Sequence, residues 1–232
     1  IFVGSKETKL LVDCGISAKR IEKSLDELDT RASELSGILI THEHSDHIKG
    51  LGVMLRRYGL PVFATAKTID AVLDSRYIGK VDKDLFHPIE ADHPFQLDDI
   101  TVEASHVWHD AADPVCYSFC SEGFKASIAT DLGDYDEYLV EKIRDSHILF
   151  VEANHDVNML QVGSYPYYLK RRILGDHGHL SNERCAQLIE DTVTEKTQKV
   201  YLGHLSKENN FAELAYETVK VALEKPDFLM EV

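Results

Sequence analysis

Short apolar runs that end on polar residues recur along the chain, and they predict β-strands. Several of these runs alternate between apolar and polar side chains, as a strand does when one of its faces is buried. The Ser121-Glu122-Gly123 step between two of them indicates a hairpin turn. The expected strands cover Lys9–Asp13, Gly37–Thr41, Pro61–Ala64, Ile100–His106, Val115–Ser121, Phe124–Thr130, His147–Glu152, Lys199–Leu202 and Phe228–Val232.

Longer stretches carry apolar residues three and four positions apart, and they predict amphipathic helices. Ser17, Asp134 and Ser181 each stand where the N-cap of such a helix is expected. Gly59 stands where one of the helices is expected to end. The expected helices run from Ser17 to Leu28, Ile48–Tyr58, Thr68–Asp74, Tyr135–Arg144, Tyr167–Leu174, Asn182–Val193 and Ala212–Leu223.

The order of these elements mixes runs of strands with crossover helices. This order indicates an α/β protein of the α+β kind, in which sheets and helices form separate layers. No Pro/Gly-rich linker, internal repeat or low-complexity segment marks a boundary. A chain of 232 residues is therefore expected to form a single domain over residues 1–232.

Composition and charge narrow the class of protein. The net charge of −15 argues against a globally basic nucleic-acid binder, although a local basic stripe remains compatible with it. The four cysteines form no Cys-x-x-Cys pair, which favours reduced structural thiols in a cytoplasmic protein. No apolar run reaches the length of a membrane span, so no membrane partner is expected. The first residue is Ile1, from which we expect a preceding segment to be missing.

The densest group of candidate ligands follows the predicted strand at residues 37–41. His42, His44 and His47 offer imidazole nitrogens, and Asp46 offers a carboxylate oxygen. Zn²⁺ and Mn²⁺ accept both ligand types. Chance clustering of the twelve histidines in this chain is the alternative, but packing does not require imidazoles at these spacings around an aspartate. The loop therefore predicts part of a metal site.

Other candidate ligands stand at the ends of predicted strands, where open α/β layers bind their ligands. A single histidine or carboxylate after a strand is usually a surface or capping residue. Four such residues, in a chain that also carries the loop of His42, His44, Asp46 and His47, are poorly explained as surface or capping residues. The four residues are Asp13, His109, Asp131 and His204.

The pattern His42-x-His44-x-Asp46-His47, with these four residues at their separations, resembles the metallo-β-lactamase superfamily. The surrounding sequences are similar to its YycJ/WalJ branch of bacterial metallohydrolases, regarded as 5′-to-3′ DNA exonucleases. They begin at His109 (HDAADP), Glu152 (EANHD), Gly178 (GHLSN) and Gly203 (GHLS). The resemblance covers essentially the whole chain. It implies a four-layer αββα sandwich whose first strand and Ser-Gly-Ser-x-Gly-Asn turn lie outside this chain.

The resemblance also implies a site with two divalent ions, which can be Zn, Mn, Fe or Ni. It assigns His42, His44 and His109 to the first ion. It assigns Asp46, His47 and His204 to the second, with Asp131 bridging both. Asp13 is expected to orient a ligand histidine through the second ring nitrogen. Capping of the adjacent turn is the alternative role for Asp13.

Two divalent ions about 3.5–4 Å apart can hold the attacking and leaving oxygens of an in-line displacement. The positive charge of the two ions exceeds the negative charge of Asp46, Asp131 and a hydroxide. The site therefore stays positive, which favours an anionic phosphodiester as substrate. We expect the hydroxide to attack phosphorus and the 3′-oxygen of the neighbouring nucleotide to leave.

The leaving oxygen needs a proton, and His179 is the candidate general acid, paired with Glu152. Helix capping or substrate contact is an equally supported role for His179. Expected substrate contacts are His155 and the two serines Ser181 and Ser206, which can hold a phosphate at a helix amino terminus.

Several functions remain open for such a site. A DNA exonuclease is favoured; RNA processing of the tRNA 3′ type, small-molecule ester or thioester hydrolysis, and a non-catalytic metal-binding module are the alternatives. The sequence favours DNA over RNA only through the resemblance, and the oligomeric state is not readable. Two basic clusters are candidate nucleic-acid contacts or simply solvated helix faces. One is Arg56-Arg57; the other is Lys170-Arg171-Arg172, which follows Tyr165, Tyr167 and Tyr168.

Overall fold

The protein was analysed as a computed structural model, which describes residues 1–223 and 228–232. The contacts between residues divide the chain into two compact units. Unit 1 consists of Ile1–Ala104 and Ala111–Val115, and unit 2 of Ser105–Asp110 and Cys116–Val232.

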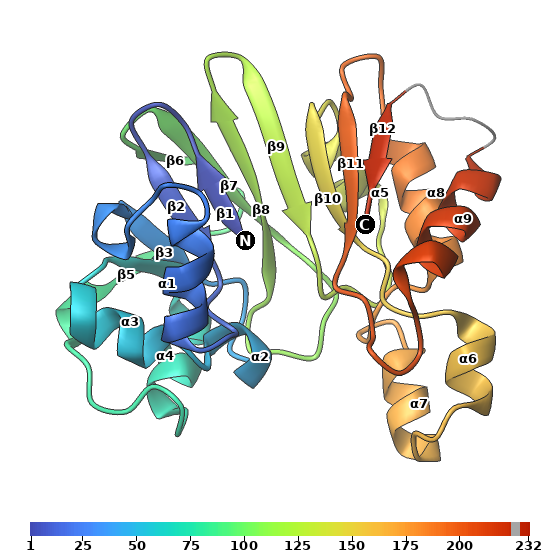
Figure 1. Cartoon of the computed structure of the whole chain (residues 1–232), viewed down its shortest axis with the longest axis horizontal. Helices are drawn as coiled ribbons and strands as arrows, with labels where there is room; N and C mark the ends of the chain where they lie inside the picture. Colours follow the sequence, from blue (N-terminus) through green and yellow to red (C-terminus); the bar gives the residue numbers. More distant parts are fainter. Residues whose placement is uncertain (224–227) are drawn as a thin grey trace. The chain divides into compact units, whose positions relative to one another are not determined.

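The strands of unit 1 form a sheet in the order β1-β2-β3-β4-β5 (Figure 1). Strands β1 and β2 pair antiparallel, whereas β2, β3, β4 and β5 pair parallel. A further antiparallel pair joins β6 to the start of β7. The bounds are β1 Phe2–Gly4, β2 Lys9–Val12, β3 Gly37–Leu39, β4 Val62–Thr65, β5 Phe86–Ile89, β6 Phe95–Leu97 and β7 Ile100–His106.

Helices of unit 1 bury one apolar stripe each against this sheet. Ile21 and Leu25 of α1 and Met54 of α3 belong to the same buried cluster as the sheet residue Ile38. The helix expected over 48–58 is two helices, because the amide of Gly50 donates its hydrogen bond to the carbonyl oxygen of Cys14 and not to a preceding helical turn. The bounds are α1 Ala18–Asp26, α2 Ser45–Ile48, α3 Leu51–Tyr58 and α4 Ala66–Asp74, with short 3₁₀ turns at Ala32–Glu34 and Lys83–Leu85.

The strands of unit 2 run in the order β12-β11-β10-β9-β8. The expected hairpin is confirmed, since β8 and β9 pair antiparallel up to Ser121 and Phe124. Strands β9, β10, β11 and β12 pair parallel, so the carboxyl ends of β9, β10 and β11 lie at one edge. The bounds are β8 Val115–Ser121, β9 Phe124–Ala129, β10 Ile148–Glu152, β11 Lys199–Gly203 and β12 Leu229–Glu231.

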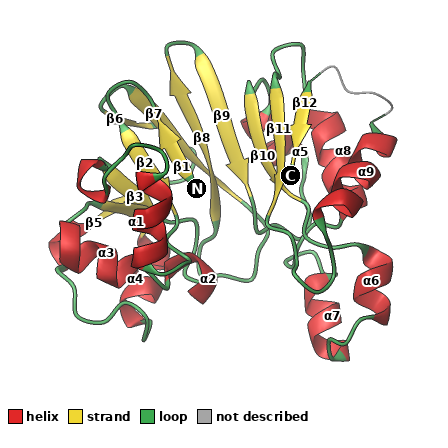
Figure 2. Ribbon diagram, in the orientation of Figure 1, coloured by secondary structure: helices red, strands yellow, loops and turns green. Residues whose placement is uncertain are grey.

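Helices of unit 2 differ from expectation at two places (Figure 2). Helix α5 begins after Asp136, whose side chain accepts a hydrogen bond from the amide of Leu139. Asp134, the expected cap, instead accepts from the guanidinium of Arg184. Helix α6 was not expected, because one and a half turns carry too few residues for a periodic pattern. The bounds are α5 Glu137–Ile143, α6 Val157–Val162, α7 Tyr167–Ile173, α8 Asn182–Thr192 and α9 Ala212–Ala222.

The mixed α/β class is confirmed, and each unit supplies one sheet with helices packed on it. In unit 2 the buried cluster joins Leu139 of α5, Leu188 of α8 and Val219 of α9 to Leu149 and Val200 of the sheet. None of the helices within the described residues is long and apolar enough to cross a membrane. All four cysteines are free thiols, as expected, and three of them are buried.

Candidate metal centre and general acid

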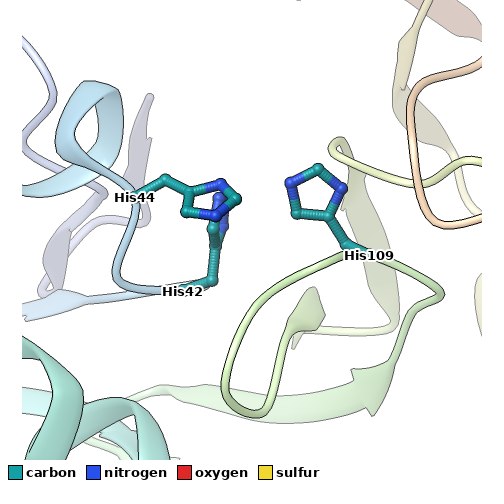
Figure 3. Close-up of side chains that lie close together, drawn as sticks. All are labelled: His42, His44 and His109. Atoms are coloured by element: carbon teal, nitrogen blue, oxygen red, sulfur yellow. The ribbon is translucent and has the colours of Figure 1, made fainter. Parts of the chain in front are cut away.

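The predicted ligands of unit 1 lie on the loop that follows β3 and on the short helix α2. The ring centroid of His42 lies 4.6 Å from that of His44 and 4.1 Å from that of His47. Figure 3 shows His42 and His44 on this loop and His109 on the loop after β7. His42 and His47 are buried, whereas the Asp46 side chain is 69% exposed and its Oδ2 lies 3.8 Å from His47 Nε2. Three imidazoles and one carboxylate thus share one short segment.

Asp13 and Thr41 fix the ring orientation of two of these histidines. Asp13 Oδ2 lies 2.8 Å from His47 Nδ1 and accepts a hydrogen bond from the Thr41 hydroxyl at 2.9 Å. The same hydroxyl lies 3.0 Å from His42 Nδ1. With its own proton given to Asp13, the hydroxyl oxygen accepts from His42 Nδ1. Both histidines therefore carry the proton on Nδ1, which leaves Nε2 as the ligand atom.

Two further contacts hold the loop in place. Glu43 Oε1 accepts a hydrogen bond from the amide of Ala112, which agrees with a role in shaping the loop. Gly15, in the loop after β2, lies very close to α2. A Cβ atom there would be 1.4 Å from the carbonyl oxygen of Asp46. Only glycine lets the backbone after β2 pass the ligand-bearing helix at this distance.

In unit 2, the predicted ligands surround the carboxylate of Asp131. Asp131 Oδ1 lies 3.8 Å from His109 Nε2 and 3.7 Å from His204 Nε2. Asp131 follows β9 and His204 follows β11, both with positive φ, at the edge where these parallel strands end. His109 Nδ1 lies 3.0 Å from the carbonyl oxygen of Gly178, so this ring also carries its proton on Nδ1. Its Nε2 is left to bind an ion.

Glu152 is fully buried at the end of β10 and contacts two histidines of unit 2. Its Oε1 lies 2.6 Å from His179 Nδ1 and 3.3 Å from His204 Nδ1. Its Oε2 accepts a hydrogen bond from the amide of Leu132. The sequence predicted the pairing with His179; the contact with His204 was missed, because nothing in the sequence indicates which of several histidines reaches one carboxylate.

The pKa values of this pair reflect burial and mutual charge. Burial alone lowers the pKa of His179, but the charge and hydrogen bond of Glu152, together with Asp131, outweigh it and hold this pKa above its ordinary value. Burial alone raises the pKa of Glu152, but His179 and His204 outweigh it and lower this pKa. Both shifts favour a carboxylate beside a protonated imidazole, the arrangement that a general acid requires.

The donor set of each unit fits a divalent metal. His42, His47 and His109 each have Nδ1 tied to a protein acceptor. In unit 2, Asp131 Oδ1 lies 3.8 Å from His109 Nε2 and 3.7 Å from His204 Nε2, so these three side chains can share an ion. Imidazoles held by their second nitrogen, beside carboxylates, are the usual ligands of Zn²⁺ and related ions.

The expected substrate contacts are engaged in local structure. His155 is buried, with 1% of its surface exposed, and burial lowers its pKa to about 4, so the ring is neutral. This burial argues against direct contact with a large substrate. Ser181 Oγ caps α8 by accepting from the amide of Arg184, and Ser206 Oγ accepts from the amide of Asn209. Both hydroxyl protons remain available for a phosphate oxygen.

Thr41 is the residue of this site that the sequence analysis missed. Its hydroxyl connects Asp13 with His42, as described above. A signal was present, because Thr41 ends the predicted strand directly before the first ligand histidine. A threonine there also fits a buried strand by its β-branched shape, so the residue type alone does not reveal this role.

Both the sequence and the fold are similar to those of known proteins. The model of the beta-lactamase superfamily domain matches residues 8–205. The chain is 42% identical over 228 residues to exodeoxyribonuclease YycJ of Bacillus anthracis, covering 98% of this chain and 86% of the relative. It is 42% identical over 226 residues to exodeoxyribonuclease WalJ of Streptococcus pneumoniae serotype 2, covering 97% and 84%. The metallo-beta-lactamase fold protein YhfI of Bacillus subtilis superposes with a TM-score of 0.72 at 15% identity, covering 99% and 86%.

The contact between Asp13 and His47 can be tested by metal binding. Replacing Asp13 by Asn keeps a residue that tolerates positive φ but removes the charged acceptor of His47. We expect Asp13→Asn to weaken zinc binding by about 10- to 100-fold, measured by competition with a chromophoric chelator. Asp29→Asn is the matched control, because Asp29 also has positive φ and is exposed. Equal affinity in Asp13→Asn and the wild type would exclude this role.

Proposed function

Because this chain belongs to the beta-lactamase superfamily domain family, and within it to the family of the exodeoxyribonucleases YycJ and WalJ, we propose that it is a metal-dependent phosphodiesterase that degrades DNA from the 5′ end. The observation that carries this proposal is the 42% identity over 98% of the chain. The protonated imidazole beside a buried carboxylate supports it, since hydrolysis of a phosphodiester benefits from a separate proton donor. We propose further that residues 1–232 act as one hydrolase domain, and the free thiols support a cytoplasmic location.

We propose that the site holds two divalent ions, of Zn, Mn, Fe or Ni. Three histidines would bind the first ion, two histidines and Asp46 the second, and Asp131 would bridge them. Such ions polarise the phosphate and lower the pKa of a bound water. The proposed ligands are His42, His44 and His109 for the first ion and Asp46, His47 and His204 for the second.

The protein's own residues would orient these ligands and supply the proton. Asp13 and Thr41 hold His47 and His42 by Nδ1, so that neither ring turns its N–H toward a cation. Glu152 holds the imidazolium of His179 by Nδ1, which leaves the Nε2 proton for the 3′-oxygen as it leaves. This assignment favours a nuclease over a thioester hydrolase, whose thiolate leaves without a proton.

The substrate class is tested by a panel of labelled substrates. In the presence of Mn²⁺ or Zn²⁺ we expect 5′-labelled DNA to release labelled mononucleotide from the start of the reaction. We expect 3′-labelled DNA to shorten progressively, RNA of the same sequence to react more slowly, and a chelator to stop all cleavage. Hydrolysis of simple thioesters with no cleavage of either nucleic acid would overturn the nuclease proposal.

The second ion is tested by Asp46→Ala. The Asp46 side chain is 69% exposed, so its loss leaves folding intact. In the absence of zinc, we expect this variant and the wild type to unfold at the same temperature. We expect the variant to bind less metal per chain and to have no nuclease activity. Full activity in Asp46→Ala would remove Asp46 from the metal ligands.

The role of His179 is tested by the leaving group. We expect His179→Ala to cleave DNA about 10²- to 10⁴-fold more slowly, because the 3′-oxygen leaves unprotonated. The same variant should hydrolyse bis(4-nitrophenyl) phosphate at nearly the wild-type rate, because nitrophenolate leaves without a proton. His93→Ala, at an exposed position of unit 1, is the control for loss of an imidazole. Equal losses on both substrates would contradict the general-acid role.

A further inference from the structure

Helices α6 and α7 form a part of unit 2 with its own charge. The segment from Val157 to Gly175, called here the α6–α7 arm, contains three basic residues and no Asp or Glu, in a chain with a net charge of −15. Figure 1 shows the two helices next to one another, apart from α5, α8 and α9. The arm is thus a locally positive element in a negative protein.

Two of the three cations hold the arm in place. Lys170 Nζ donates hydrogen bonds to the carbonyl oxygens of Gln161 and Gly163 at the end of α6, at 2.8 and 2.6 Å. Arg172 donates to both carboxylate oxygens of Asp110. The buried side chain of Ile173 fixes the inner face of α7. These contacts hold α7 against α6 and the His109 loop. The third cation, Arg171, takes no part in them.

The outer face of α7 presents aromatic rings and a cation to solvent. Tyr167 is 76% and Tyr168 74% exposed, and Arg171 is exposed. Arg171 lies four positions after Tyr167 and three after Tyr168, so the three side chains share one side of the helix. Within the described part of the chain, neither tyrosine hydroxyl nor the Arg171 guanidinium has a hydrogen-bond or ion-pair partner. Two adjacent rings with this exposure form an apolar surface beside a cation.

The arm is attached to the candidate metal site through the His109 loop. Asp110, which holds Arg172, directly follows His109, and the carbonyl of Gly178 contacts His109 Nδ1. The rings of Trp108 and His177 stack between these contacts, at a centroid distance of 6.4 Å. Contacts within unit 2 therefore connect α7 with the loop that carries the ligand His109.

We propose, on the basis of the proposed nuclease function, that the outer face of α7 binds single-stranded DNA next to the cleaved end. Bases would stack on Tyr167 and Tyr168, and a phosphate would pair with Arg171. Charge favours this occupant, because Arg171 on this face has no carboxylate partner among the described residues, whereas Asp110 neutralises Arg172. Base stacking needs unpaired bases, so the strand rather than the duplex fits this face. The basic residues of α3 are unsuited, because Arg56 donates to the carbonyls of Ile78 and Lys80 and Arg57 pairs with Glu22.

The proposal is tested by the affinity of the metal-loaded protein for a fluorescent single-stranded phosphorothioate oligonucleotide, which resists cleavage. We expect the Tyr167→Ala/Tyr168→Ala variant to bind about tenfold or more weakly, and the Tyr167→Phe/Tyr168→Phe variant to bind like the wild type, because stacking needs only the ring. We expect Arg171→Glu to weaken binding and to lower the salt dependence by about one phosphate contact. Lys67→Glu, at an exposed position of α4, is the control for the change of charge.

Two further readouts separate binding from chemistry. Trp108, the single tryptophan, is 41% exposed. We expect its emission to change over the same range of protein and oligonucleotide concentrations as the fluorescence anisotropy of the labelled oligonucleotide. Hydrolysis of bis(4-nitrophenyl) phosphate should be the same in all four variants. Oligonucleotide affinity unchanged in the double alanine variant would overturn the proposal. If the wild type still degrades DNA in that case, the proposed function stands; a wild type that neither binds nor cleaves DNA removes both.

Discussion

The arrangement of unit 2 around the candidate site depends on one buried carboxylate. Glu152 has no exposed surface, and an unpaired charge in such a position is strongly unfavourable. Three hydrogen bonds compensate it, from the amide of Leu132 and from the Nδ1 atoms of His179 and His204. One carboxylate therefore sets the protonation of a proposed acid and the orientation of a proposed ligand. The loop after β9, the loop before α8 and the loop after β11 are coupled through it.

Backbone conformation at the strand ends makes this coupling possible. Asp13 and His204 directly follow a strand, Asp131 lies two residues after one, and all three have φ between 56° and 61°. A left-handed conformation costs roughly 1–2 kcal/mol for a residue with a Cβ atom. The turn it produces directs the side chain back across the strand ends, where the carboxylates and imidazoles of each unit meet. Strain of this kind persists where the surrounding contacts fix it, and it is concentrated at functional sites.

The sequence predicted those features that depend on local pattern. The apolar runs before Asp131 and His204 located β9 and β11, and the spacing of His42, His44 and His47 located the ligand loop. The start of α5 was predicted wrongly, because Asp134 and Asp136 are equally good caps and only the long-range contact with Arg184 decides between them. Thr41 and the second contact of Glu152 were missed for the same reason: both depend on side chains that come together only in the fold. Long-range hydrogen bonds between polar side chains leave no periodic trace in a sequence.

Charge distribution connects the fold with the proposed substrate. A protein of net charge −15 repels DNA at long range, so productive binding has to rely on short-range contacts and on the local potential. At an ionic strength of about 0.15 M the Debye length is about 8 Å, which means that distant carboxylates are largely screened. Under these conditions a strand experiences mainly the groups within a few ångströms of its path. The proposed contact of Arg171 with a phosphate meets that requirement, because α7 is held through Asp110 to the His109 loop and Arg171 itself has no carboxylate partner among the described residues.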